Sequence, residues 1–371
     1  MVSPGARAAL AAALAAVLLA AAAGPLAADV GVKLRLLESA SRISEGDWAL
    51  VTLGTARVSV AASSENVKAE VAVDAILGDG IVASLARASI GVRFPSLRLT
   101  VGKARLSWGE GMAFNAGDLL FGSTSAVGLD LTGDALRDDA AWLASVYVPL
   151  GQFSFAEAVA LPPPVDVVEL VENPLAPLPD PSEIALGGRV VGKLLGIKTE
   201  AAYLFRGAEL AHHAAVSLQG NLVVDWHLSA SASIPAIAPD AADLAEGLRL
   251  SAGLFHLQRL GDRATLSVRL ETLVAPGGSW KEEEPPAVPV YGILLYPELA
   301  LGIDDDFSVT ARALVSPIDG SALLVPGVSL SLLKGLTFLG MASGSIGDGT
   351  DSYSFDRAGG LAFILGCAYT Y

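Results

Sequence analysis

Two groups of charged residues carry the chemistry that this sequence offers. One group is basic and lies on the polar sides of segments whose residues alternate between apolar and polar: Lys33, Arg35, Arg57, Arg87, Arg93, Arg98, Lys103 and Arg105. The other group is acidic and lies in one long segment, 109–139: Glu110, Asp118, Asp130 and Asp134. Opposite charges on two sides of a water-filled passage select among ions through the width and the field of that passage. If the chain brings these two groups face to face across water, we expect the bases to line one side of the gap and the acids to narrow it from the other.

The other reactive side chains do not form a recognisable site. His212 and His213 are adjacent in an alternating segment, so they point to opposite faces and cannot hold a metal ion together. No serine stands in a nucleophile motif, and no glycine-rich loop opens a helix as nucleotide binding requires. The net charge of −15 argues against nucleic acid as a partner. We therefore expect no enzyme activity, no metal and no cofactor.

The elements that must position these charges are β-strands. In the last eleven residues, large apolar side chains occupy every second position: Leu361, Phe363, Leu365, Cys367, Tyr369 and Tyr371. Alternation at period two is typical of a strand with two different faces. Similar segments recur from Val30 onward, and none approaches the ~18 consecutive apolar residues of a membrane helix. Because backbone groups in hydrocarbon must all be paired, an alternating chain meets lipid only as a closed barrel.

Eighteen strands are predicted, with sixteen as the alternative count. Their ranges are 30–43, 48–60, 67–77, 81–93, 97–108, 140–149, 152–161, 182–195, 197–206, 210–219, 223–234, 248–259, 263–275, 290–303, 307–316, 321–333, 336–346 and 358–371. Most connections after even-numbered strands are very short, whereas the long ones all follow odd-numbered strands: 109–139, 162–181, 235–247, 276–289 and 347–357. This rhythm is typical of an antiparallel transmembrane barrel with short periplasmic turns and long extracellular loops. A soluble β-sandwich and a β-helix are the alternatives.

The alternation slips within the segment 97–108. Leu99 and Val101 share a parity with Lys103 and Arg105, although their chemistry is opposite. We expect a β-bulge at Gly102, which would return both bases to the polar face.

The N-terminus has the composition of a secretory signal. Arg7 precedes an apolar run of alanine, leucine and valine, and small residues follow at Ala27 and Ala28. We predict cleavage after Ala28, which leaves 29–371 as the barrel; a retained membrane anchor is the alternative. Cys367 is the only cysteine, so the chain has no intramolecular disulfide.

The acidic segment is unusually apolar for a loop in water. Folding into the barrel would bury Phe114, Leu119, Leu120 and Phe121 and set the carboxylates opposite the bases. Two alternatives remain. The arginines can pair with wall acids in a generic polar lining, with Glu70, Asp74, Glu200 and Glu271 as partners, or the loop can plug the barrel.

These features together resemble the bacterial porins. The resemblance rests on the signal, the alternating strands, the long third loop and the aromatic final strand. The stretch from Trp108 through Gly109, Glu110 and Gly111 to Asn115 and Asp118 is also similar to a strand-end motif of porin-like barrels. Aromatic residues are scarce, at 6%, and the chain ends on Tyr where the family more often has Phe.

The resemblance implies a fold, a place and a function. The loop after the fifth strand would line the narrowest point, with its acids facing bases on the wall. The chain would reach the bacterial outer membrane through the periplasm, where barrel-assembly machinery reads the last strand, and it would let small hydrophilic solutes diffuse passively. A transporter of hydrophobic molecules and a non-transporting structural or adhesive surface barrel are the alternatives. A homo-oligomer is left open.

Overall fold

The computed structural model describes residues 27–42, 47–77, 80–123, 140–163, 180–239, 241–277, 292–304, 306–349, 351–356 and 358–371. Within these ranges, eighteen strands form one antiparallel sheet. The strands are β1 (Ala27–Arg42), β2 (Ala49–Ser63), β3 (Val67–Leu77), β4 (Ile81–Arg93), β5 (Arg98–Ala104), β6 (Ala141–Pro149), β7 (Phe155–Leu161), β8 (Ala185–Leu194), β9 (Ile197–Arg206), β10 (Ala211–Asn221), β11 (Asp225–Pro235), β12 (Arg249–Leu260), β13 (Ala264–Val274), β14 (Ile293–Ile303), β15 (Phe307–Ser316), β16 (Ser321–Leu333), β17 (Leu336–Ile346) and β18 (Leu361–Thr370). A short helix, α3 (Ala241–Gly247), precedes β12. None of the helices among the described residues is long and apolar enough to span a membrane.

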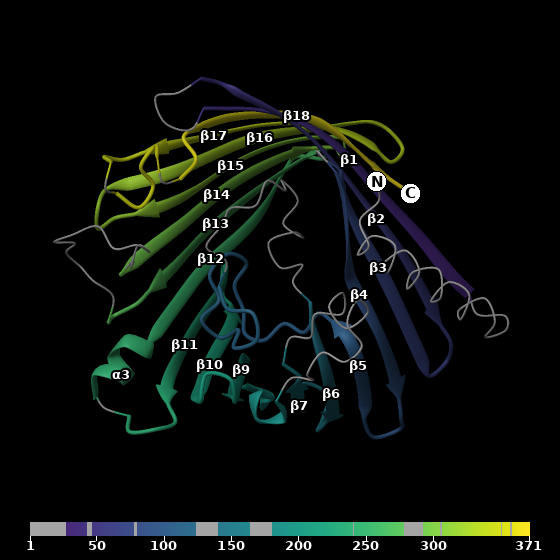
Figure 1. Cartoon of the computed structure of the whole chain (residues 1–371), viewed down its shortest axis with the longest axis vertical. Helices are drawn as coiled ribbons and strands as arrows, with labels where there is room; N and C mark the ends of the chain where they lie inside the picture. Colours follow the sequence, from purple (N-terminus) through teal and green to yellow (C-terminus); the bar gives the residue numbers. More distant parts are fainter. Residues whose placement is uncertain are drawn as a thin grey trace.

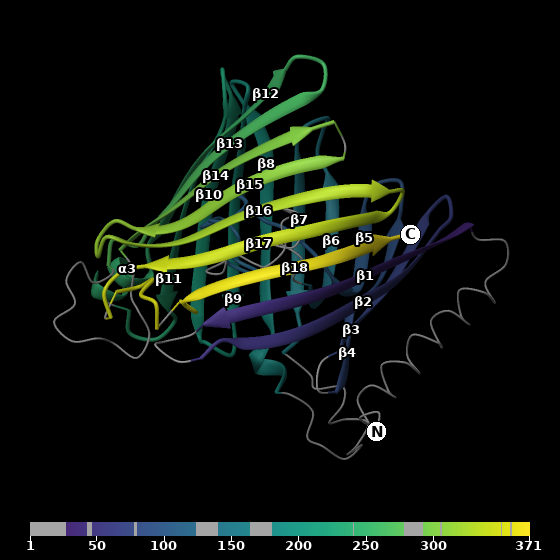
Figure 2. The same cartoon turned by 90° about the horizontal axis from the view of Figure 1, so that it is seen from above.

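The sheet closes on itself. Each strand pairs with its sequence neighbour, and β1 pairs with β18 from Lys33–Thr370 to Arg42–Leu361 (Figures 1 and 2). At the seam, Tyr371 N donates to Val32 O at 2.9 Å, and Val32 N donates to Tyr371 O at 3.1 Å. The predicted closed antiparallel barrel of eighteen strands is therefore confirmed. The sandwich and β-helix alternatives are wrong, because a closed sheet leaves no second sheet and no stacked coil.

The predicted strand bounds agree well with the structure. The bounds of β3, β4, β9, β15, β16 and β17 are those expected from the sequence. The largest difference is at β5, which ends at Ala104 and not at Trp108 because the chain leaves the wall there to enter the barrel. Turns after even-numbered strands lie at one end of the barrel, the short-turn end, and connections after odd-numbered strands lie at the other, the loop end.

The outer face of the barrel is apolar around the ring of strands. Side chains on this face that remain exposed to the surroundings include Val216, Leu228, Leu254, Leu270, Leu299, Val328, Phe338, Phe363 and Leu365. Phe363, Leu365 and Tyr369 confirm the predicted outward stripe on the last strand. A continuous exposed apolar belt would be unstable in water, and it suits contact with lipid.

The wall contains a bulge, but not at the predicted place. The pairing of β4 with β5 runs without a shift through Ser89–Gly102, so the predicted bulge at Gly102 is wrong. The register shifts between β3 and β4, where Ala72 pairs with Arg87 and Val73 pairs with Leu85, which leaves Ala86 as the extra residue. Lys103 therefore shares the face of Val101, which is 48% exposed, and not the inward face of Ala104.

The predicted signal, residues 1–28, lies almost wholly outside the described residues. The strand β1 already begins at Ala27, two residues before the expected cleavage point.

Candidate functional site: the loop inside the barrel

The chain that follows β5 turns into the barrel. Figure 1 shows it crossing from β5 toward β10 and β12 before it reaches the end of its described part at Ser123. Trp108 and Phe114 are completely buried, and Leu119 and Leu120 retain only 8% and 6% of their exposure. Phe114, Leu119 and Leu120 are therefore buried, as the sequence led us to expect, and Phe121 is partly buried against the cluster that contains Leu119 and Leu120. Residues 124–139 of the expected constriction loop lie outside the described residues. We call residues 105–123 the inner loop.

Two apolar clusters hold the inner loop from opposite ends. Trp108, Leu119 and Leu120 pack with wall residues of β6, β7, β9 and β10, which are Leu143, Val159, Ala202, Leu204 and Ala215. Phe114 packs with Leu294, Tyr296, Leu314 and Tyr353, and its ring meets that of Tyr296 edge-on at 6.4 Å between centroids. Burial of large side chains contributes about 1.5–3 kcal/mol each, so these clusters help to hold the inner loop against the wall.

A single wall carboxylate binds the tip of the inner loop. Glu271 on β13 accepts hydrogen bonds from the backbone N–H groups of Met112, Ala113 and Phe114, each at 2.8 Å. Its side chain is 1% exposed and lies 3.2 Å from Arg269 Nη1. Three successive amides aimed at one carboxylate form an anion cradle, and charge-assisted hydrogen bonds are stronger than neutral ones. The carboxylate thus satisfies three buried donors that the turn leaves without partners.

Two further wall acids bind the start of the inner loop. Glu157 accepts a hydrogen bond from Trp108 Nε1 at 3.2 Å, and Glu200 accepts one from Gly109 N at 2.9 Å. Arg189 lies between them, with Nε 2.8 Å from Glu157 and Nη1 3.3 Å from Glu200. Arg189 Nη1 also donates to Ser107 O at 2.9 Å. The arginine therefore compensates both buried acids and itself binds the chain as it leaves the wall.

The far half of the inner loop is bound by a serine hydroxyl and an arginine of the wall. Ser251 Oγ accepts from Ala116 N at 3.0 Å, and Arg206 Nη2 donates to Leu119 O at 2.9 Å. Inside the loop, Asn115 Nδ2 donates to Trp108 O at 2.8 Å. Wall contacts from β7 to β13 thus follow the loop along its described length.

Glycines permit the tight path of the inner loop. Gly111 has φ +119°, and a Cβ there would lie 2.2 Å from Phe114 O. Gly109 has φ +63°, and a Cβ would lie 2.5 Å from Asn115 Oδ1. Both positions need a residue without a side chain, because space and backbone conformation exclude any other.

A contact between two connections at the loop end covers the inner loop. Asp319, between β15 and β16, accepts hydrogen bonds from Ser321 N at 3.0 Å and Ser352 N at 2.8 Å. Partial burial alone would raise the pKa of Asp319, but the hydrogen bonds from Ser352 and Ser321 outweigh it and lower the pKa to about 2. The neighbouring Tyr353 N donates to Ser321 Oγ at 3.0 Å, which places the Tyr353 ring in the cluster around Phe114.

Two of the predicted bases bind acids on their own side of the barrel. Arg57 binds Asp74 through two hydrogen bonds of 2.6 and 2.7 Å, and Arg87 binds Glu70 at 3.0 Å. Lys33 pairs across the strands with Arg57, and Arg93 pairs with Arg98, so these bases form neighbouring pairs. Arg35 lies on β1 opposite Thr55.

Arg98, Lys103 and Arg105 have different surroundings. Arg98 stacks over the Tyr147 ring at 5.4 Å near the short-turn end. Lys103 Nζ donates to Leu85 O at 2.7 Å, and Arg105 is exposed beyond the end of β5.

The described loop acids bind neighbours other than these bases. Glu110 forms an ion pair with Lys198 on β9. Asp118 Oδ1 accepts from Leu120 N at 3.1 Å and Phe121 N at 3.2 Å, which stabilises the turn at the end of the inner loop. Asp130 and Asp134 lie outside the described residues.

Sequence reasoning missed the residues that dock the loop. Glu157, Glu200 and Glu271 were visible as acids within otherwise apolar or small-residue strands, but only Glu200 and Glu271 were considered, as partners of arginines. Glu298, a further acid of this kind, binds Tyr296 and Arg312 of the wall. The signal that could have found them is their position: a carboxylate in the middle of a barrel strand requires a partner, and β7, β9, β13 and β14 each carry one. Arg189, Arg269 and Arg312 accompany them, with Arg312 Nε 2.9 Å from Glu298.

Comparisons with known proteins give a fold but no sequence family. No family model matches the chain, and no curated protein does. Among solved structures, OccK2 (OpdF) of Pseudomonas aeruginosa, crystallised with glucuronate, has a TM-score of 0.57 at 11% identity, over 93% of this chain and 98% of that one. OccK11 (OpdR) of the same organism has a TM-score of 0.56 at 10% identity, over 92% and 95%. OccAB4 of Acinetobacter baumannii has a TM-score of 0.56 at 8% identity, over 93% and 98%.

Coverage of nearly the whole length of both chains means that the likeness is one of complete barrels and not of a shared fragment. At this level of identity it establishes the fold. The closed ring of eighteen strands therefore has the fold of the Occ/Opd porins.

Proposed function

We propose that this chain is a porin-like channel of the bacterial outer membrane through which small hydrophilic solutes diffuse passively. The observation that carries the proposal is the inner loop, which enters the lumen of a closed barrel and is bound there by buried wall carboxylates. A barrel that served only as a surface scaffold would not need a loop fixed inside it. The apolar outer belt supports the membrane location.

The assignment is a passive channel and not an enzyme. The polar groups of the described site are engaged in docking the loop, with Glu271 the clearest case. The apolar side chains of the loop are buried against the wall, which disfavours a lumen padded for hydrophobic molecules. The likeness to a barrel crystallised with glucuronate supports a small polar solute.

The pore wall is proposed to comprise the bases on the inward face of β1–β5. Arg57 and Arg87 retain 31% and 27% of their side-chain exposure, so they stay in contact with water despite their acid partners. Lys33, Arg35, Arg93 and Arg98 complete this wall. Glu110 is proposed as an acid that narrows the passage, with Asp130 and Asp134 as further members. Asp118, which is buried, is proposed to hold the turn of the loop that places them.

Delivery to the membrane follows from the same proposal. Residues 1–28 would act as a cleaved signal, and barrel-assembly machinery would recognise the final strand, whose terminal Tyr371 is 77% exposed at the short-turn end. That end would face the periplasm. Assembly into a homo-oligomer is a further arrangement to test by native mass spectrometry.

The decisive experiment is electrical. Refolded protein is first checked for folding by its heat-dependent migration on gels, and is then added to a planar lipid bilayer in potassium chloride. The proposal predicts discrete current steps of uniform size. Folded protein that inserts and gives no current would contradict it.

A further inference from the structure

Three neighbouring turns at the short-turn end carry exposed apolar side chains. They are the turns β6–β7, β8–β9 and β10–β11, which are adjacent because β6–β11 are consecutive in the closed sheet. We call their six exposed apolar residues the apolar rim: Leu150, Phe153, Leu194, Leu195, Leu222 and Val223. These side chains retain between 59% and 94% of their exposure. The turn segments 150–154, 195–196 and 222–224 contain no charged residue.

Other turns at the same end show that turn geometry does not require this chemistry. Three of them carry an acid: Glu65 in β2–β3, Asp262 in β12–β13 and Asp304 in β14–β15. The turn β16–β17 follows two exposed leucines, but its two-residue turn begins with a charged residue, Lys334. The equivalent position in the two-residue turn β8–β9 is Leu195. The apolar rim is therefore a property of one sector of the barrel.

Leu195 is unfavourable in its turn for two reasons if water surrounds it. Its φ is +52°, and Gly196 follows at +87°. Turns with two residues at positive φ favour Asn-Gly or Asp-Gly, because other side chains rarely adopt this conformation. Leu195 is also 94% exposed, so no contact within the described protein compensates for the strained conformation. A surface that covers the leucine would explain both features.

The apolar rim continues the outer face of the wall. On β8, Leu186 and Val190 are each 54% exposed on the outward face, whereas Val191 is buried on the inward face. Leu194 has the parity of Leu186 and Val190, so it extends their outward stripe to the turn. The residues between them on this face are glycines, so no charged side chain separates the rim from the apolar belt.

The shortest strands of the barrel end at this rim. Among the eighteen described strands, β5, β6 and β7 are the shortest, with 7, 9 and 7 residues. At about 3.4 Å per residue and a tilt of about 40°, seven residues cover only about 18 Å, less than the apolar band of about 25 Å that membrane barrels present. The twelve residues of β12 cover about 31 Å by the same relation. An apolar band across β6 and β7 must therefore include residues beyond the strand ends, and Leu150 and Phe153 supply them at the turn.

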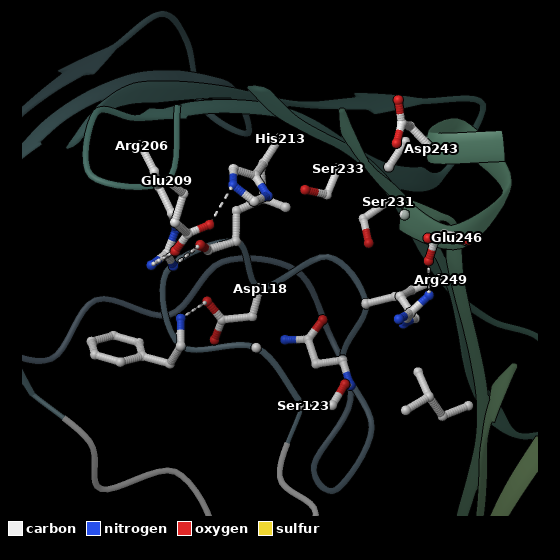
Figure 3. Close-up of a pocket in the computed structure, with 18 of the residues that line it drawn as sticks. Asp118, Ser123, Arg206, Glu209, His213, Ser231, Ser233, Asp243, Glu246 and Arg249 are labelled. Atoms are coloured by element: carbon white, nitrogen blue, oxygen red, sulfur yellow. Dashed lines mark hydrogen bonds and ion pairs between the residues drawn. The ribbon is translucent and has the colours of Figure 1, made fainter. Parts of the chain in front are cut away.

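The same sector has a different border at the loop end. There Arg206 Nη1 lies 3.4 Å from Glu209 Oε1, and His213 Nε2 lies 3.3 Å from Glu209 Oε2 (Figure 3). Figure 3 also shows Asp243 and Glu246 of α3 close to these side chains. Charged groups thus mark the loop end of β9–β12, as expected of a border that faces water, and the short-turn end of the sector lacks such a border.

We propose that the apolar rim is inserted in the membrane, where it contacts lipid at the boundary between acyl chains and headgroups on the short-turn side. Lipid is the occupant because the rim is continuous with the lipid-facing belt and completes its thickness where the strands are short. The inference goes beyond the channel function and does not rest on it, since it needs only the membrane location.

Site-directed spin labelling tests the environment of the rim. Cys367 is the only cysteine, so Cys367→Ser gives a background in which one introduced cysteine carries a nitroxide label. The labelled variants are Leu195→Cys and Leu222→Cys in the rim, Leu365→Cys in the belt as the lipid reference, and Asp262→Cys in a polar turn as the matched control. Each refolded full-length protein is placed in phosphatidylcholine vesicles, and heat-dependent gel migration verifies that it is folded.

Collisions of the label with two relaxing agents distinguish lipid from water. Oxygen concentrates in lipid, whereas a nickel chelate stays in water. We expect oxygen to dominate for both rim labels, as for Leu365→Cys, and the nickel chelate to dominate for Asp262→Cys. Rim labels as accessible to nickel as that of Asp262→Cys would overturn the proposal. That result is also the one expected if the rim binds a soluble protein, which the purified sample lacks.

The substitution Leu195→Asn gives a second test whose sign separates lipid from water. Asparagine accepts a positive φ, so in water the change would relieve the turn and raise the midpoint of urea unfolding. In lipid it removes an apolar side chain from the membrane, and the midpoint in vesicles should fall. The control Asp262→Asn should leave the midpoint unchanged. An unchanged or raised midpoint for Leu195→Asn would overturn the proposal.

Bilayer currents separate this proposal from the channel itself. Rim labels in lipid on a folded protein that gives no current would support the rim and contradict the channel. Current steps from a protein whose rim labels lie in water would overturn the rim and leave the channel standing.

Discussion

The two sides of the lumen use charge differently. On β1–β5, Arg57 and Arg87 pair with Asp74 and Glu70 and keep about a third of their exposure. On β7–β13, Glu157, Glu200 and Glu271 are nearly completely buried. Glu157 accepts from the Trp108 indole of the inner loop, and Glu200 and Glu271 accept from its backbone N–H groups. The charges of the first side stay in contact with water, as the proposed channel requires of charges that act on solutes. The charges of the second side are covered by the inner loop and hold it in place.

The largest effect is expected from removing Glu271, the buried wall acid that binds the tip of the inner loop. Glu271→Leu should leave the three amides of Met112, Ala113 and Phe114 without an acceptor. Each unsatisfied buried donor costs about 1–3 kcal/mol, so the tip should detach from the wall. We expect a larger and noisier single-channel conductance and rapid proteolysis within 105–123. The control Glu38→Gln removes an exposed acid on the outer face of β1, opposite Leu365 in the strand register, and should change neither.

A second test acts on the backbone of the inner loop. Gly111→Ala forces a side chain to within 2.2 Å of Phe114 O at a φ of +119°, and a strained position of this kind costs about 1–3 kcal/mol. Loop docking should weaken, seen as increased current noise with a smaller rise in conductance than for Glu271→Leu. The control Gly349→Ala meets no atom within 4 Å and should behave as wild type. Equal effects of the two substitutions would refute the strain argument.

A third test addresses the arginines of β1–β5 that stay in contact with water. Arg57→Gln or Arg87→Gln should shift the reversal potential in a salt gradient toward cation preference, with a change in permeability ratio below about twofold, because surrounding water and salt screen these charges. Conductance size should stay the same, since neither residue binds the inner loop in the contacts described above. An increase in conductance as large as that of Glu271→Leu would remove the distinction between the two walls.

The smallest expected effect concerns Asp319 at the loop end. Its pKa of about 2 in the folded protein lies below the ordinary 3.8, so its contribution to stability is complete above the ordinary pKa and is lost as pH falls through about 2. Proteolysis of 347–356 by an acid-stable protease should therefore be unchanged from pH 7 to pH 5 and faster at pH 2. In Asp319→Asn the segment should be cleaved faster already at pH 7, with little further change at pH 2.

Much of the barrel was predictable because each strand of a closed sheet has one outward and one inward face. The sequence of a single strand therefore shows the alternation without knowledge of its neighbours. Strands such as β3 and β9 were found to the residue, since their alternation is bounded on each side by short turns or loop residues. The inward course of the loop was also predictable from Phe114, Leu119 and Leu120, which are too apolar for a solvated loop.

The partners of the inner loop were not predictable from local pattern. Glu271 meets residues 112–114 only after the chain has crossed the lumen, and no spacing in the sequence encodes that contact. The prediction of a bulge at Gly102 was wrong for a related reason. The change of parity near Gly102 lies just before β5 leaves the wall, whereas the extra residue is Ala86 on the neighbouring strand β4.

The central claim is that buried wall carboxylates fix the inner loop and so set the width of the passage. The most direct measurement is polymer exclusion: single-channel conductance is recorded with neutral polyethylene glycols of increasing size in wild type and in Glu271→Leu. The account predicts that larger polymers enter the variant than enter the wild type. The same exclusion limit in both proteins, with the inner loop of the variant shown by proteolysis to be released, would contradict it.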